Sequence, residues 1–131
     1  MKIHQIKSSF FNSNTYIIEN NFGKILLVDP GDPKVDKLKK LININNWMIS
    51  GVLLTHEHAD HIAGLISLLN YEKLTIYCSK KCSTNIQNSK SNFSRYIDNI
   101  DPFELDIDTN ILNNNKLYKI EGFEFLFIET P

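Results

Sequence analysis

Two nearly all-apolar runs constrain the fold of this 131-residue chain more than any other feature. They are KILLVD at 24–29 and GVLLTH at 51–56, and each ends in polar residues. A run that is apolar on both faces is typical of a strand buried inside a parallel sheet. Because parallel strands need a crossover between them, we expect a helix in the intervening segment. The pattern predicts an α/β layered domain.

The segment between these strands has the features of a helix and of a sharp break before it. Asp29-Pro30-Gly31-Asp32-Pro33 follows the first strand and interrupts regular structure. We expect Asp32 to cap the helix and Pro33 to occupy its first position. The apolar residues at helical spacing are Val35, Leu38, Leu41 and Ile42.

Shorter patterns suggest the remaining elements. We expect a first strand around His4, further strands at 14–20 and 74–79, and a helix at 62–70. The apolar face of that helix would be Ile62, Leu65, Ile66 and Leu69. Residues 80–102 are polar, with room for one short helix, and KLYKI and FEFLFIET flank Glu121-Gly122 as a hairpin. No internal repeat or linker is visible, so 1–131 is treated as one domain.

Composition excludes several classes of function. A net charge of −1 gives no general attraction to nucleic acid or to anionic membranes. The N-terminal residues lack the apolar core of a signal peptide, so a cytoplasmic location is the expectation. Cys78 and Cys82 form a single C-x3-C pair, which favours free thiols in a reducing compartment over a structural zinc site.

Three of the four histidines fall within six residues, directly after the second buried strand. His56, His58, Asp60 and His61 form the pattern H-x-H-x-D-H, and Asp60 stands where the helical zinc-protease motif requires a histidine. At the end of a strand, His56 and His58 can converge on one ion, and Asp60 with His61 can serve a neighbouring ion. Imidazole and carboxylate are ligands for zinc, iron or manganese. The cluster therefore predicts a metal site with room for two divalent ions.

The stretch Thr55, His56, His58, Asp60, His61 resembles the signature of the metallo-β-lactamase fold hydrolases. The order NTYII, KILLVDPGD, helix, GVLLTHEHADHIAGL, LTIYCS is similar to the N-terminal part of that family. Within it the chain looks most like the glyoxalase II-like branch, with a looser match at SNFS (91–94) and DPFEL (101–105). The resemblance implies an αββα sandwich, incomplete here.

The resemblance also implies a role for each matching residue. His56 and His58 would bind a first metal, while Asp60 and His61 would bind a second, with zinc as the first expectation. Asp60 would also orient the attacking water. Asp29 would lie next to the metal ligands and fix their orientation without binding the metal. Asp29 could equally be a turn-opening residue before Pro-Gly. Glu57 is expected to point away from the metals.

The same resemblance predicts missing ligands. Family members continue, after a strand that ends in Thr-Pro, with a Gly-His-Thr motif and further ligands, whereas this sequence ends at Pro131. We therefore expect the isolated chain to bind divalent metal weakly and to hydrolyse little, because each ion would have two protein ligands instead of three. The chain would be a truncated hydrolase, an inactive metal-binding or interaction module, or half of a split enzyme.

For a complete site, the resemblance implies attack of a metal-bound hydroxide on an ester or thioester in a small-molecule substrate. β-Lactam hydrolysis is less favoured because no secretion signal is visible, and a nuclease role is less favoured because the charge is not basic. Two partner interactions stay open. The chain could form a homo-oligomer, or a second chain could supply the missing C-terminal half.

Overall fold

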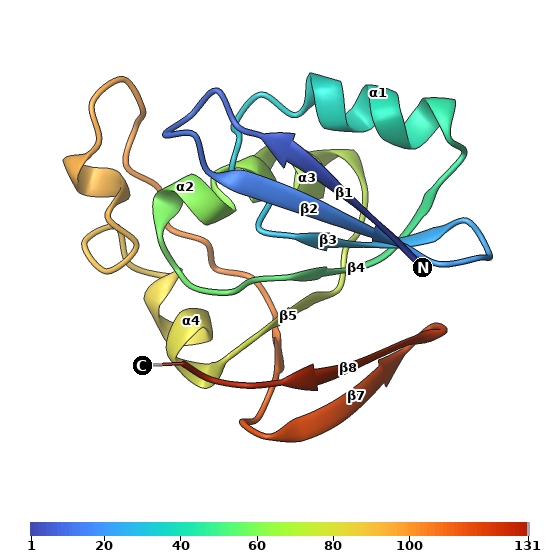
Figure 1. The fold of residues 1–131 in the computed structure, drawn as a ribbon. Helices are drawn as coiled ribbons and strands as arrows, with labels where there is room; N and C mark the ends of the chain where they lie inside the picture. The colour runs from blue at the N-terminus through green and yellow to red at the C-terminus, as the bar shows by residue number, and fades with distance from the viewer. Residues whose placement is uncertain (131) are drawn as a thin grey trace.

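A six-stranded sheet forms the centre of the computed structural model, which describes residues 1–130 (Figure 1). Its strands lie in sequence order from β1 to β6, with β1–β3 antiparallel and β3–β6 parallel. They are β1 (Lys2–Lys7), β2 (Asn14–Glu19), β3 (Lys24–Val28), β4 (Met48–Leu53), β5 (Ile76–Cys78) and β6 (Asn110–Ile111). The α/β class predicted from the sequence is confirmed.

The two apolar runs form the adjacent central strands β3 and β4. Ile25, Leu26 and Leu27 of β3 are at most 1% exposed, as expected for a strand covered on both faces. Strand β4 starts three residues before the predicted run and ends at Leu53, so His56 lies in the loop beyond it.

The helix between these strands, α1 (Asp36–Ile44), starts later than predicted. The prediction that Asp32 caps this helix is wrong, because the N-cap position is Val35 and no side chain caps it. The Asp32 carboxylate instead accepts hydrogen bonds from the backbone N–H groups of Ser9 and Lys34. Asp32 therefore stabilises the turn before the helix rather than the helix itself.

The predicted helix at 62–70 is two shorter helices, α2 (Ala59–Ile62) and α3 (Gly64–Tyr71). Ile62, Leu65 and Leu68 are at most 1% exposed and face the sheet. The placement of Ile66 on this face is wrong, since its side chain is 39% exposed. The buried stripe repeats every three residues, and Ile66 lies one residue off it.

The segment after β5 contains α4 (Lys80–Asn85), in keeping with the short helix expected there, and a 3₁₀ turn at Ser94–Tyr96. It is followed by the short strand β6, which was not predicted from the sequence. Ser79 caps α4 by accepting from the N–H of Cys82. The final hairpin is confirmed as β7 (Lys116–Ile120) and β8 (Phe123–Phe127), with positive φ at both turn residues. Pro131, the last residue of the predicted Thr-Pro ending, lies outside the described residues.

The core is split between the two faces of the sheet. Helices α1 and α3 cover one face, where the large apolar cluster includes Ile17, Leu27 and Trp47. The hairpin packs on the other face, where Leu26 contacts a smaller cluster with Phe123. The order helix, sheet, hairpin is part of the predicted αββα sandwich. In the described part of the chain, no helix is long and apolar enough to cross a membrane.

Candidate metal centre

The candidate site lies where the parallel strands β3 and β4 end. The register pairs Val28 with Leu53, and the N–H of Asp29 donates to the carbonyl of Leu53 over 3.0 Å. Asp29 is the first residue beyond β3 and Thr55 is the second beyond β4, and the two are therefore neighbours. The carboxyl ends of parallel strands are the usual location of sites in α/β folds.

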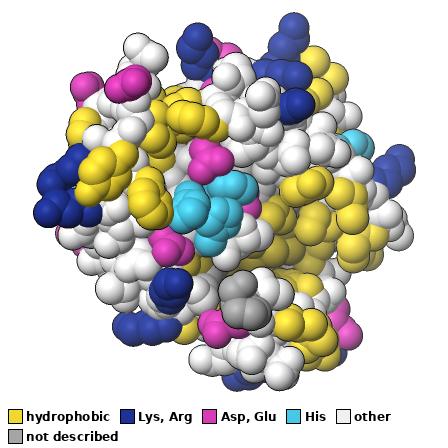
Figure 2. Space-filling model, turned by 60° about the vertical axis from the view of Figure 1, so that its left-hand side comes forward, with side chains coloured by type: hydrophobic (Ala, Val, Ile, Leu, Met, Phe, Trp, Pro, Cys, Tyr) yellow, Lys and Arg dark blue, Asp and Glu magenta, His cyan; other side chains and the backbone are white. Residues whose placement is uncertain are grey.

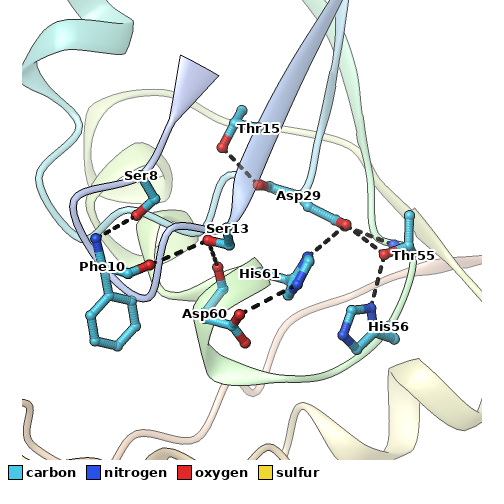
Figure 3. A network of polar contacts seen from close by, with 9 residues as sticks. All are labelled: Ser8, Phe10, Ser13, Thr15, Asp29, Thr55, His56, Asp60 and His61. Carbon is cyan, nitrogen blue, oxygen red and sulfur yellow. Dashed lines mark hydrogen bonds and ion pairs between the residues drawn. The ribbon is translucent and has the colours of Figure 1, made fainter. Parts of the chain in front are cut away.

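Asp29 is a buried polar residue of the site, at 4% exposure. Its Oδ1 accepts the backbone N–H of Thr55 over 2.7 Å, and its Oδ2 accepts both the Thr55 hydroxyl and Nδ1 of His61, the latter over 2.9 Å (Figure 3). Its backbone carbonyl accepts the hydroxyl of Thr15. The backbone of Asp29 adopts a φ of 51°, a conformation that Asp and Asn tolerate better than most residues.

The three clustered histidines meet in space. The ring centroids of His56 and His61 are 4.1 Å apart, and those of His56 and His58 are 4.7 Å apart. His58 also contacts the ring of Phe93 at 4.8 Å. The sequence motif is therefore also a spatial cluster, although its residues come from a loop and a short helix rather than from one face of a helix.

Asp60 reaches the same cluster from the first turn of α2. Its Oδ2 lies 3.4 Å from Nε2 of His61, on the opposite side of the ring from Asp29. The backbone carbonyl of Asp60 accepts the hydroxyl of Ser13 over 2.6 Å, which anchors this turn to the loop before β2.

Donor atoms of Asp29, His56 and His61 lie within 4.8 Å of one another, a grouping compatible with a metal ion. This grouping differs from the predicted ligand set: it includes Asp29, and it leaves out His58 and Asp60. The hydrogen bonds of Asp29 show whether it is better placed to bind an ion or to orient the residues that bind one. Both oxygens of Asp29 already accept N–H or O–H donors, and its proximity to His61 is itself a hydrogen bond. Asp29 is therefore better placed to orient ligands than to bind an ion.

Two glycines allow the loop after β3 to approach the helix that carries Asp60 and His61. A Cβ on Gly31 would lie 1.7 Å from the carbonyl oxygen of Asp60. A Cβ on Gly64 would lie 2.5 Å from the carbonyl oxygen of Pro30, which accepts the N–H of Gly64 over 2.9 Å. The backbones touch at both positions, so the site geometry depends on the absence of side chains there.

The local environment shifts the pKa values of two histidines in opposite directions. The hydrogen bond to Asp29 raises the pKa of His61, against the effect of burial. Burial lowers the pKa of His56, and the neighbouring charge of His61 lowers it further. A neutral His56 is the form in which an imidazole binds metal.

The other acidic and histidine side chains behave as expected. Glu57 turns away from the histidines, and its Oε1 accepts the side-chain amide of Asn85 over 2.9 Å. His4 lies on β1, where its Nε2 is 2.8 Å from Glu19 and its ring contacts Trp47. His4 is thus not part of the cluster.

An apolar hollow of about 520 Å³ opens beside His56, between the sheet and the hairpin. Figure 2 shows the histidines next to this hollow. Its apolar lining is Val28, Leu53, Leu54, Leu112, Phe125, Leu126, Phe127 and Ile128, and its polar lining includes Glu57, Ser79 and Lys81. The hollow is a candidate location for a substrate or for further polypeptide.

Several contributors to the site were not recognised in the sequence. Ser13 and Phe93 reach it from distant loops, and the backbone carbonyl of the fully buried Asn92 accepts the N–H of Ala59 at the start of α2. The loose match around 91–94 was the only sequence signal for Asn92 and Phe93, and no signal pointed to Ser13. Thr55 was part of the recognised motif, but no function was predicted for its hydroxyl.

The metallo-beta-lactamase superfamily sequence model matches residues 9–122. The chain therefore belongs to the metallo-beta-lactamase superfamily. A "Probable metallo-hydrolase" of Streptococcus pyogenes serotype M6 is 27% identical over all of this chain and 57% of its own length. A hydroxyacylglutathione hydrolase of Erwinia tasmaniensis is 35% identical over 56% of this chain and 29% of its own length.

Solved structures agree on the fold. The crystal structure of BLEG-1 B3 metallo-beta-lactamase matches with a TM-score of 0.88 at 23% identity, over 99% of this chain and 62% of that one. A di-iron-bound form of TTHA1623 matches with a TM-score of 0.72 at 20% identity, over 86% of this chain and 55% of that one. At these identities the likeness shows the fold alone. The chain spans about three fifths or less of each of these relatives.

Proposed function

We propose that this chain supplies the metal-binding part of a hydrolase active site that cleaves an ester or thioester. The observation that carries this proposal is the cluster of three imidazoles, with ring centroids 4.1 and 4.7 Å apart, at the end of a parallel strand. The partial similarity to a hydroxyacylglutathione hydrolase favours a thioester over other acyl compounds. The donor set of imidazoles and one carboxylate fits a divalent metal.

In this proposal His56 and His58 hold one ion, and Asp60 and His61 hold a second. A divalent ion held by these residues would supply Lewis-acid polarisation of a carbonyl group and would lower the pKa of a water molecule. Asp60 lies beside His61 with a carboxylate that can accept a proton or a hydrogen bond from water. In this proposal the apolar hollow beside His56 receives the acyl group. Zinc is the first choice of metal, with iron and manganese as alternatives.

Four ligands are few for two ions, since catalytic zinc usually has three protein ligands. We infer that the remaining ligands of a complete site come from the part of the relatives' length that this chain does not span. The chain alone is then expected to bind metal weakly and to turn over a thioester slowly.

Equilibrium dialysis of the purified 131-residue chain against zinc tests the metal site. We expect saturable binding that is strongly weakened by His56→Ala and unchanged by His4→Ala, the matched control on β1, where His4 contacts Glu19 and Trp47 and not the cluster. Assays with a glutathione thioester and with a chromogenic cephalosporin compare the two candidate reactions. Zinc uptake that His56→Ala leaves unaltered would contradict the proposal, and hydrolysis of the cephalosporin alone would reassign the substrate.

A second candidate function is that of an interaction module. The hairpin exposes Leu117, Leu126 and Ile128, each more than half exposed, beside the apolar hollow. Such a surface favours contact with more polypeptide. Light scattering of the chain tests this idea. Self-association that Leu126→Glu abolishes, with metal binding retained, would support a homo-oligomer, and a monomer at all concentrations would exclude one.

A further inference from the structure

One chain of hydrogen bonds links two histidines of the cluster through a single carboxylate. Oδ2 of Asp29 contacts Nδ1 of His61 directly over 2.9 Å. The same oxygen contacts the hydroxyl of Thr55, whose oxygen lies 2.9 Å from Nδ1 of His56 (Figure 3). Asp29 therefore contacts one imidazole itself and reaches the other through Thr55.

The chemistry of the groups fixes the direction of each bond. The Asp29 carboxylate only accepts, so His61 must donate from Nδ1. The Thr55 hydroxyl has one hydrogen, and its bond to Asp29 uses it. Toward His56 the hydroxyl oxygen can then only accept, so Nδ1 of His56 must carry a hydrogen. In their neutral forms both imidazoles have their free lone pair on Nε2.

We propose that Thr55 is a positioning residue that extends the orienting effect of Asp29 to His56. Through its hydroxyl, Thr55 fixes the Nδ1–H tautomer of His56 and presents Nε2 to the metal. The consequence for metal affinity rests on the proposed function, whereas the tautomer is a property of the metal-free chain. Hydrogen bonds of this type commonly set the tautomer and the ring orientation of metal-binding histidines.

The backbone holds Thr55 independently of its hydroxyl. The N–H of Thr55 donates to Oδ1 of Asp29 over 2.7 Å, and the N–H of Asp29 donates to the carbonyl of Leu53. Both bonds remain when the side chain is changed. Valine has the shape of threonine without the hydroxyl, so Thr55→Val removes the link to His56 while the loop keeps its anchors. Thr55→Ser keeps the hydroxyl and serves as the matched variant.

Long-range ¹H–¹⁵N NMR of the metal-free chain, at a pH where the imidazoles are neutral, reads the tautomer of each histidine. We expect the Nδ1–H form for His56 and His61 in the unaltered chain. Thr55→Val should move His56 toward the Nε2–H form and leave His61 unchanged, and Thr55→Ser should restore His56. The His61 signal also reports whether Thr55→Val is folded.

Zinc competition with a chromogenic chelator gives the second readout. We expect Thr55→Val to lower zinc affinity by about 10–100-fold, the usual effect of losing a group that orients a ligand, and Thr55→Ser to stay near the unaltered chain. A His56 tautomer that is the same in Thr55→Val and in the unaltered chain would overturn the proposal. A tautomer change in a chain that binds no zinc would uphold Thr55 and refute the metal site instead.

Discussion

Oδ2 of Asp29 lies 2.9 Å from Nδ1 of His61, although the two residues are 32 positions apart in the sequence. This contact connects the end of β3 with the short helix α2, and it places a buried carboxylate directly behind the histidine cluster. Asp29 thereby contacts both its own loop partner Thr55 and a histidine of the candidate site, and its role in supporting metal ligands stays a prediction.

Replacement of this carboxylate should weaken the metal site. Asp29→Asn keeps a residue type that tolerates positive φ, but its amide cannot accept all three donors. We expect zinc affinity to fall about 10–100-fold and the free energy of unfolding to fall by about 1–3 kcal/mol. Isothermal titration and urea denaturation measure these effects. Asp32→Asn, in the same loop but with its carboxylate bonded to Ser9 and Lys34, is the control and should leave zinc affinity unchanged.

The contact between the loop after β3 and helix α2 should tolerate no side chain at Gly31. In Gly31→Ala the new Cβ would overlap the carbonyl oxygen of Asp60, so the loop after β3 must move away from α2. We expect a loss of about 1–3 kcal/mol in stability, together with weaker zinc binding. Gly23→Asn is a suitable control, because its turn has positive φ but a nearest neighbour at 4.0 Å. Equal effects of the two substitutions would argue against the contact.

The opposite pKa shifts of His61 and His56 predict opposite pH dependences in the metal-free chain. The raised pKa of His61 contributes stability that is present below pH 6.5 and is lost as the pH rises through the folded-state pKa. The lowered pKa of His56 means that folding opposes its protonation, so it reduces stability as the pH falls below 6.5. The destabilisation caused by His61→Asn should therefore shrink on going from acidic to alkaline pH.

His56→Asn provides the complementary measurement, since it should improve in relative stability at acidic pH. Urea denaturation with a chelator present, at pH values on either side of 6.5, measures both variants. Parallel pH profiles for the two variants would show that the Asp29 hydrogen bond does not distinguish these histidines.

The two cysteines should resist alkylation in the folded chain. Cys78 and Cys82 are free and at most 1% exposed. The hydrogen bond that the Cys82 thiol donates to Cys78, together with burial, raises the pKa of Cys82, which keeps it in the unreactive protonated form. Iodoacetamide labelling followed by mass spectrometry should be slow in buffer and fast in urea. Fast labelling of Cys82 in buffer would show that α4 opens readily.

The sequence predicted the main strands and a candidate metal site. The apolar runs identified β3 and β4, and the spacing of His56, His58, Asp60 and His61 was itself enough to predict a metal cluster. Both signals are local, because strand burial and ligand density depend on residues that are close in the sequence. The final hairpin was likewise readable from its flanking strands and its Glu121-Gly122 turn.

Only the tertiary structure decided which distant groups support that cluster. The pairing of Val28 with Leu53 brings Asp29 next to Thr55, and the close approach at Gly31 brings α2 against the same loop. The contact of Asp32 with Ser9 and the exposure of Ile66 are likewise features of the tertiary structure. Strand register and backbone contact join residues that are tens of positions apart, so no local pattern specifies them. The sequence therefore determined which residues could bind a metal, and the fold decided which residues hold them in place.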